Sequence, residues 1–189
     1  MNGHLICLIG LTTKATLEDG NKSVVNSLSF IDYCAAVNYS MYLCQKTVSK
    51  QLFDNIESVV LLTHIESDQK EGGDPTGPAA ELARDVTQPK VDAVISGHSH
   101  KMVNGTIQNL SSFNDVCVGQ ASTEGRGYVD LTFKFDNSKI LLNNSINKLG
   151  LSHIYEKYSN EYVKLIDNKP FDIIQSFILI VRKLCFIKI

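Results

Sequence analysis

Apolar and polar residues along the middle of the chain predict a strand, a helix and a second strand. Residues 58–63 (SVVLLT) and 91–96 (VDAVIS) form short apolar runs rich in β-branched residues, a composition typical of buried strands. Between them, residues 78–86 (PAAELARDV) begin with a proline and carry an apolar stripe, as expected for a helix. This order defines a βαβ unit, so we expect the two strands to be parallel.

The same alternation is found before this unit. Residues 4–10 (HLICLIG) form an apolar run of strand length, and the polar residues 17–28 predict a loop. Residues 29–40 and 41–56 are expected to be helical, the second with apolar residues at every fourth position: Cys44, Val48, Leu52 and Ile56. The first 64 residues therefore repeat the βαβ pattern.

After the second strand, residues 128–136 (YVDLTFKFD) alternate between apolar and polar side chains. This pattern predicts a half-buried strand that is antiparallel to its neighbour. Residues 149–166 predict an amphipathic helix, and residues 171–189 are the most apolar stretch. Its longest uninterrupted apolar run, 177–181, is too short to span a bilayer, so we expect a core or interface helix, with an interfacial membrane helix as the alternative.

Three of the five histidines follow the two central strands. His64 follows the first strand, and His98 and His100 follow the second. Because the carboxyl ends of parallel strands meet at one edge of a sheet, we expect the three side chains to gather there. A histidine after a strand is usually a solvated loop residue when it is alone, but convergence of three favours a metal site, since neutral imidazole suits zinc, manganese, iron or nickel.

The spacing of the last two histidines adds to this interpretation. In an extended segment, the two-residue spacing of His98 and His100 would place both imidazoles on one side. The loop 65–77 adds four carboxylates that could serve a cation or substrate hydroxyls, although a solvated acidic loop is the commoner interpretation of each. They are Glu66, Asp68, Glu71 and Asp74.

Composition narrows the classes of function. The net charge of −2 lacks the excess of basic residues that is typical of nucleic-acid-binding proteins. The five cysteines form no C-x-x-C pair and are odd in number, so they predict neither a disulfide framework nor a zinc knuckle. The first residues lack the basic stretch and small-residue cleavage site of a secretory signal.

Six motifs stand in a definite order along the chain: GLTT (10–13), LTH (62–64), VDAVISGHSH (91–100), GQAS (119–122), GYVDLTFKFD (127–136) and IYEKYSNEYVKLI (154–166). Together they resemble the 5′-nucleotidase branch of the calcineurin-like metallophosphoesterases. The resemblance covers about residues 3–166 and implies that residues 1–145 form the C-terminal half of a four-layer αββα sandwich, followed by a linker helix and apolar tail over 146–189.

The resemblance implies two divalent metal ions, zinc, manganese or similar, with His64 and His98 as ligands of one ion and His100 as a ligand of the other. It also implies hydrolysis of a nucleotide or another phosphate ester by in-line attack of a metal-activated water. Such enzymes often work in the periplasm or outside the cell. The family's D-x-H and G-N-H-E motifs, the latter with the catalytic histidine, and a suitably placed G-D motif are not found here.

We therefore expect the chain alone to be weakly active or inactive, because three neutral imidazoles cannot offset the charge of two metal ions. Sheet edges left without neighbouring strands would favour self-association. Two alternatives remain: a non-catalytic remnant that binds a metal or a partner, and a self-contained hydrolase with one zinc ion on three histidines.

Overall fold

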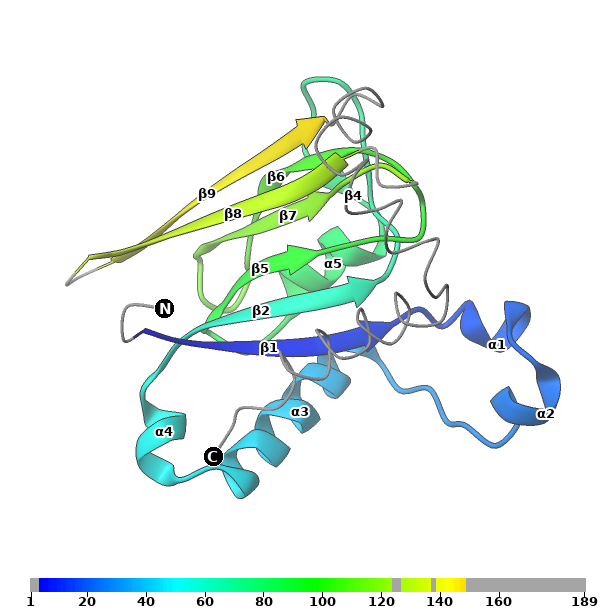
Figure 1. The fold of residues 1–189 in the computed structure, drawn as a ribbon, viewed down its shortest axis with the longest axis horizontal. Coiled ribbons are helices and arrows are strands. Elements are labelled where there is room, and N and C mark those ends of the chain that lie inside the picture. The colour runs from blue at the N-terminus through cyan, green and yellow to red at the C-terminus, as the bar shows by residue number, and fades with distance from the viewer. Residues whose placement is uncertain (1–3, 124–126, 137–138, 149–189) are drawn as a thin grey trace, which may run out of the picture. The chain divides into compact units, whose positions relative to one another are not determined.

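The computed structural model describes residues 4–123, 127–136 and 139–148. Their centre is a five-stranded sheet with the strand order β1-β2-β5-β7-β6 (Figure 1). Four strands are parallel, and the edge strand β6 is antiparallel to β7. The strands are β1 (Leu5–Thr12), β2 (Ile56–His64), β5 (Val91–Ile95), β6 (Val103–Gln108) and β7 (Asp115–Gln120). The predicted α/β class and the parallel pairing of the two central strands are confirmed.

Two helices cover one face of this sheet. Helix α3 (Tyr33–Thr47) connects β1 to β2 by way of α4 (Lys50–Asp54), and α5 (Pro78–Asp85) connects β2 to β5. Helix α5 has its proline in the first turn and buries its apolar stripe, as its sequence predicts. Both crossovers therefore form the expected βαβ units.

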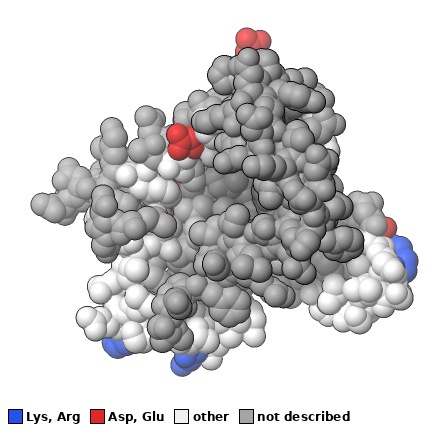
Figure 2. Space-filling model, in the orientation of Figure 1, with Lys and Arg blue, Asp and Glu red and all other residues white. Residues whose placement is uncertain are grey.

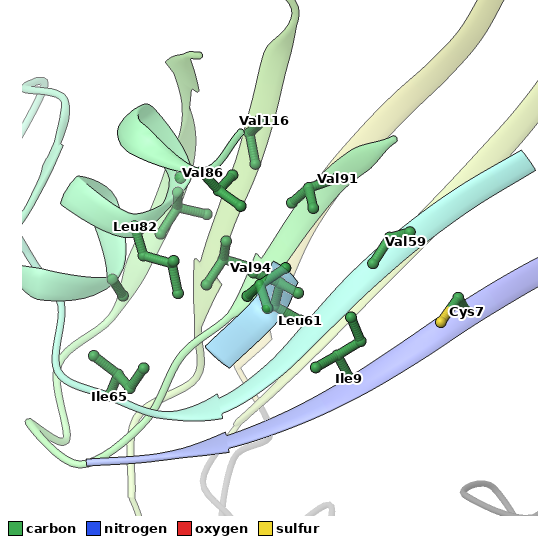
Figure 3. Close-up of a cluster of buried hydrophobic side chains, with 14 of the residues drawn as sticks. Cys7, Ile9, Val59, Leu61, Ile65, Leu82, Val86, Val91, Val94 and Val116 are labelled. Carbon is green, nitrogen blue, oxygen red and sulfur yellow. The ribbon is translucent and has the colours of Figure 1, made fainter. Parts of the chain in front are cut away.

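The main core lies between the sheet and these helices. Leu61 and Val94 are fully buried on the sheet, and Leu82 of α5 lies against this face (Figure 3). Burying a side chain of this size stabilises the folded state by about 1.5–3 kcal/mol, so this layer contributes strongly to the stability of the fold.

A second, two-stranded sheet covers the opposite face. It consists of β8 (Gly127–Asp136) and β9 (Lys139–Lys148). Leu131 and Phe133 of β8 pack against Val60, Ala93 and Cys117 of the large sheet. The predicted half-buried strand is confirmed, and the described residues form a helical layer followed by two sheet layers.

The continuous helix predicted over residues 41–56 is wrong. Helix α3 ends at Thr47, and Val48 is extended. Ser49 then caps the separate helix α4, because its hydroxyl accepts a hydrogen bond from the Leu52 amide at 3.2 Å. The four-residue apolar spacing thus runs across a helix break and into β2, which begins at Ile56.

Two polar segments contain more regular structure than their sequences predict. The loop expected over 17–28 overlaps two short helices, α1 (Thr16–Asp19) and α2 (Lys22–Val25). The loop over 65–77 contains a small antiparallel ribbon of β3 (Asp68–Gln69) and β4 (Pro75–Thr76). Gly105 of β6 permits close approach of this ribbon, since a Cβ at that position would lie 2.7 Å from the Pro75 ring.

The chain divides into two compact units, Met1–Asn147 and Lys148–Ile189. The helix predicted over 149–166 and the apolar tail predicted over 171–189 lie outside the described residues, and the predicted boundary between 145 and 146 stays a prediction. No helix among the described residues is long and apolar enough to cross a membrane. On the face in Figure 2, the described Lys and Arg side chains lie apart from one another and form no continuous basic patch.

Candidate metal centre

The carboxyl ends of β2 and β5 bring two histidines together. His64 is the last residue of β2, and the turn 97–100 follows β5, its parallel neighbour. Two hydrogen bonds of 3.1 Å join these ends: the Thr63 hydroxyl donates to the Ile95 carbonyl, and the Gly97 amide donates to the Ile65 carbonyl. Gly97 packs against the His64 imidazole, since a Cβ at that position would lie 3.4 Å from Nδ1, about van der Waals contact.

The two imidazoles of His64 and His98 face each other through ring nitrogens. Nε2 of His64 lies 3.3 Å from Nδ1 of His98. The rings meet edge to face, with centroids 5.1 Å apart and an interplanar angle of 75°. Two nitrogen ligands at zinc-binding distance in a tetrahedral site are also about 3.3 Å apart. The pair therefore fits one shared metal ion, and the same separation allows a hydrogen bond between neutral rings.

His100 is placed differently from the extended arrangement that its spacing predicts. The backbone φ angle is 77° at His98 and 58° at His100, so both residues are left-handed and the segment is a turn. The rule that alternate side chains share one side of a strand does not apply to a turn. His100 is exposed, and among the described residues no three His, Cys, Asp or Glu side chains form a group that could hold a metal ion.

A buried polar network supports the turn between the histidines. Its centre is Gln120, which is fully buried at the end of β7. The Gln120 Oε1 atom accepts hydrogen bonds from the hydroxyls of Ser67 and Ser96, each at 3.2 Å. Its Nε2 atom donates to the Ser99 hydroxyl at 2.7 Å and to the Lys101 carbonyl at 3.0 Å. The network therefore joins the loop after β2 to the turn after β5.

From the sequence, residues 119–122 (GQAS) are expected to form a loop, an expectation that gives Gln120 no role. In the structure, β7 continues through Gly119 and Gln120 before this loop begins. A usable signal is present in the sequence, because a polar amide follows the apolar run 116–118 after a single glycine. A polar side chain at the end of a buried strand needs hydrogen-bond partners inside the protein.

The four acidic residues of the loop after β2 are all exposed. Asp68 accepts a hydrogen bond from the Gln69 amide at 2.8 Å and pairs with Nζ of Lys101 at 3.2 Å. The amide and then the lysine hold the pKa of the Asp68 carboxyl below its usual value. The Asp68 carboxylate thus links β3 to Lys101, and within the described part of the chain none of these four carboxylates joins a metal-binding group with the histidines.

No family model matches the chain, and no curated protein matches it.

Proposed function

We propose that this chain contributes the histidine half of a metal-dependent phosphoesterase site of the 5′-nucleotidase type, within an αββα sandwich of the calcineurin-like metallophosphoesterases. The observation that carries this proposal is the 3.3 Å separation of Nε2 of His64 and Nδ1 of His98. It occurs at the carboxyl edge of a parallel sheet, where α/β proteins bind ligands. The order of the sequence motifs supports the assignment to this class.

In the proposed site, His64 and His98 hold one divalent ion, zinc, manganese or similar, and His100 is the ligand assigned to a second. Such ions, when bound, lower the pKa of water and neutralise charge on a phosphate ester. Neutral imidazoles cannot offset the positive charge of two such ions, so the site also needs carboxylates. We propose that another polypeptide segment supplies these carboxylates, so that this chain alone is weakly active or inactive.

A second candidate function is metal or partner binding without catalysis. The observation that favours it is that the two facing imidazoles lack a carboxylate in a common metal-binding group among the described residues. A site of this composition can hold an ion and still leave a nucleotide phosphate unhydrolysed. The two candidates share the same ligands and differ in turnover.

Zinc binding by the purified chain, measured by isothermal titration calorimetry, tests the shared part of both candidates. We expect His98→Ala to weaken binding more than about 100-fold, because losing a ligand costs more than losing an outer partner, which costs about 10–100-fold. His4→Ala is the matched control, since His4 is also near a strand end but bonds Glu57 at 2.9 Å. The proposal would be contradicted if the folded wild-type chain binds no zinc, or if the wild type and His98→Ala bind zinc with the same affinity.

Phosphate release from 5′-AMP, with Mn²⁺ or Zn²⁺ added, then separates the candidates. Release that requires both the metal and His98 supports the phosphoesterase. Zinc binding that requires His98, without any phosphate release, supports the non-catalytic binding module.

A further inference from the structure

Gln120 is the one described side chain whose hydrogen bonds reach both segments that carry the facing histidines. Ser67 lies three residues after His64, and Ser96 lies two residues before His98. Both hydroxyls lie within hydrogen-bond distance of the same Gln120 oxygen and of each other, so the three oxygens share two hydroxyl protons. The Gln120 oxygen on β7 therefore adds a shared contact to the direct hydrogen bonds that already join β2 and β5 at this edge.

The other end of the Gln120 amide holds the turn itself. Its Nε2 donates to the Ser99 hydroxyl at 2.7 Å, and this hydroxyl in turn donates to the Ser67 carbonyl at 2.5 Å. Ser99 lies between His98 and His100, the two residues with left-handed backbones. L-residues adopt this conformation at an energetic cost, so the surrounding contacts must hold them in it.

We propose that Gln120 is a positioning residue for metal binding, acting through Ser99 to hold His98 against His64. This inference rests on the proposed metal site. Without the Gln120 amide, Ser99 loses its donor and the Lys101 carbonyl loses its partner, so the turn can relax toward a more common backbone conformation. His98 then no longer presents Nδ1 at 3.3 Å from Nε2 of His64.

The test compares zinc affinity with stability in Gln120→Ala and in a matched control, Asn109→Ala. Asn109 is also a buried amide, 2% exposed, that joins distant segments. Its Nδ2 donates to the carbonyls of Ala83 at 2.9 Å and Val86 at 2.8 Å, and its Oδ1 accepts from the amides of Ser111 and Ser112. Both variants remove a hydrogen-bonding hub, but Asn109 serves the end of α5 and not the histidine turn.

Zinc dissociation constants are measured by calorimetry at a temperature where circular dichroism shows every variant to be folded. We expect Gln120→Ala to weaken zinc binding by about 10–100-fold, the effect of losing an outer partner of a metal ligand, and Asn109→Ala to leave it unchanged. Ser99→Ala removes a smaller, half-buried group and should weaken binding in the same direction, which keeps the test usable if Gln120→Ala does not fold.

The outcomes separate this inference from the proposed function. If the wild type binds zinc and His98→Ala does not, but Gln120→Ala or Ser99→Ala binds as tightly as the wild type, the positioning role is wrong and the metal site stands. Equal weakening by Asn109→Ala would also overturn it, because the effect would then be one of general stability. If the folded wild type binds no zinc, the metal site itself is wrong and this inference falls with it.

Discussion

At the scale of single residues, three non-glycine residues in the described part of the chain have left-handed backbones: His98, His100 and Phe113. Two of them flank Ser99 in the candidate metal centre, where buried hydrogen bonds hold the turn. A left-handed backbone costs energy at a non-glycine residue, so it persists only where the surrounding structure holds it. Such residues cluster at functional sites. Phe113 lies instead in an exposed turn between β6 and β7, and the residue is 75% exposed.

Phe113 allows the cost of this conformation to be measured away from the site. We expect Phe113→Gly to be more stable than Phe113→Ala by about 0.5–1 kcal/mol, because relief of about 1–2 kcal/mol of left-handed strain exceeds the extra chain entropy of glycine, about 0.5–1 kcal/mol. The bond from the residue 113 amide to the Asn109 carbonyl, 3.0 Å, is available in both variants. Urea denaturation measures the difference, and a more stable alanine variant would contradict this account.

At the scale of elements, the predictions succeed where periodicity and burial agree. Strands β2 and β5 and helix α5 bury most of the apolar residues that define their patterns, and Leu62 of β2 is the exposed exception at 39%. Strand β6 carries only a short alternation, in which Val103, Gly105 and Ile107 are less exposed than the polar residues between them, and we make no strand prediction there. Its pairing with β7 is a tertiary contact that the local sequence of β6 does not indicate. The break after α3 depends on the Ser49 cap of α4. The four-residue apolar spacing continues across this break and therefore predicts one uninterrupted helix.

The candidate site, like the elements, could be predicted from the sequence only in part. The approach of His64 and His98 follows from the general topology of parallel strands, so the sequence could indicate it. The left-handed turn and the hydrogen-bond partners of Gln120 could not be predicted in this way, because they depend on contacts between residues up to 53 positions apart. The expected extended arrangement of His98 and His100 fails for this reason.

The pairing of β2 with β5 contains a register shift at Asp92, a partly buried acidic residue that should make the stability of the fold depend on pH. Val59 pairs with Val91 and Val60 with Ala93, so Asp92 is the extra residue at the register shift. Its Oδ2 atom is buried and has no hydrogen-bond partner among the described residues. Burial raises the pKa of the Asp92 carboxyl, and the Ser58 hydroxyl offsets this rise in part.

A carboxyl whose pKa is raised by folding stabilises the protein at low pH, and this stability is lost as the pH rises through the raised pKa. Below the ordinary value of 3.8 the carboxyl is protonated in both states and its ionisation carries no penalty. We therefore expect Asp92→Asn to be more stable than the wild type by about 1 kcal/mol at pH 7, with the gain shrinking toward pH 4. Denaturant titrations across this range measure it, with Asp115→Asn as an exposed control. A gain that grows as the pH falls would contradict the assignment.

At the scale of the whole described unit, the two edges of the large sheet differ. The edge strand β6 is covered by the ribbon, because the Gln69 side chain accepts from the Asn104 amide at 2.7 Å and donates to its carbonyl at 3.1 Å. At the other edge, β1 pairs with β2 alone among the described strands. Its sequence, LICLIGLT, contains no charged residue and no proline, the groups that usually protect an edge from pairing with another chain.

We expect this β1 edge to pair with the β1 edge of a second copy, and a single lysine should prevent it. Gly10 is the position for this test, because it is exposed and a Cβ there would meet no heavy atom within 4 Å. Gly10→Lys should remain folded while placing a charge on the edge, which opposes strand pairing.

Gln45→Lys adds the same charge at an exposed position of α3 and is the control. Sedimentation velocity over a concentration series should show mass rising above 20.9 kDa for the wild type and Gln45→Lys, and remaining near it for Gly10→Lys. Equal association of the two lysine variants would place the interface elsewhere, and a monomeric wild type at every concentration would show that β1 does not pair between copies.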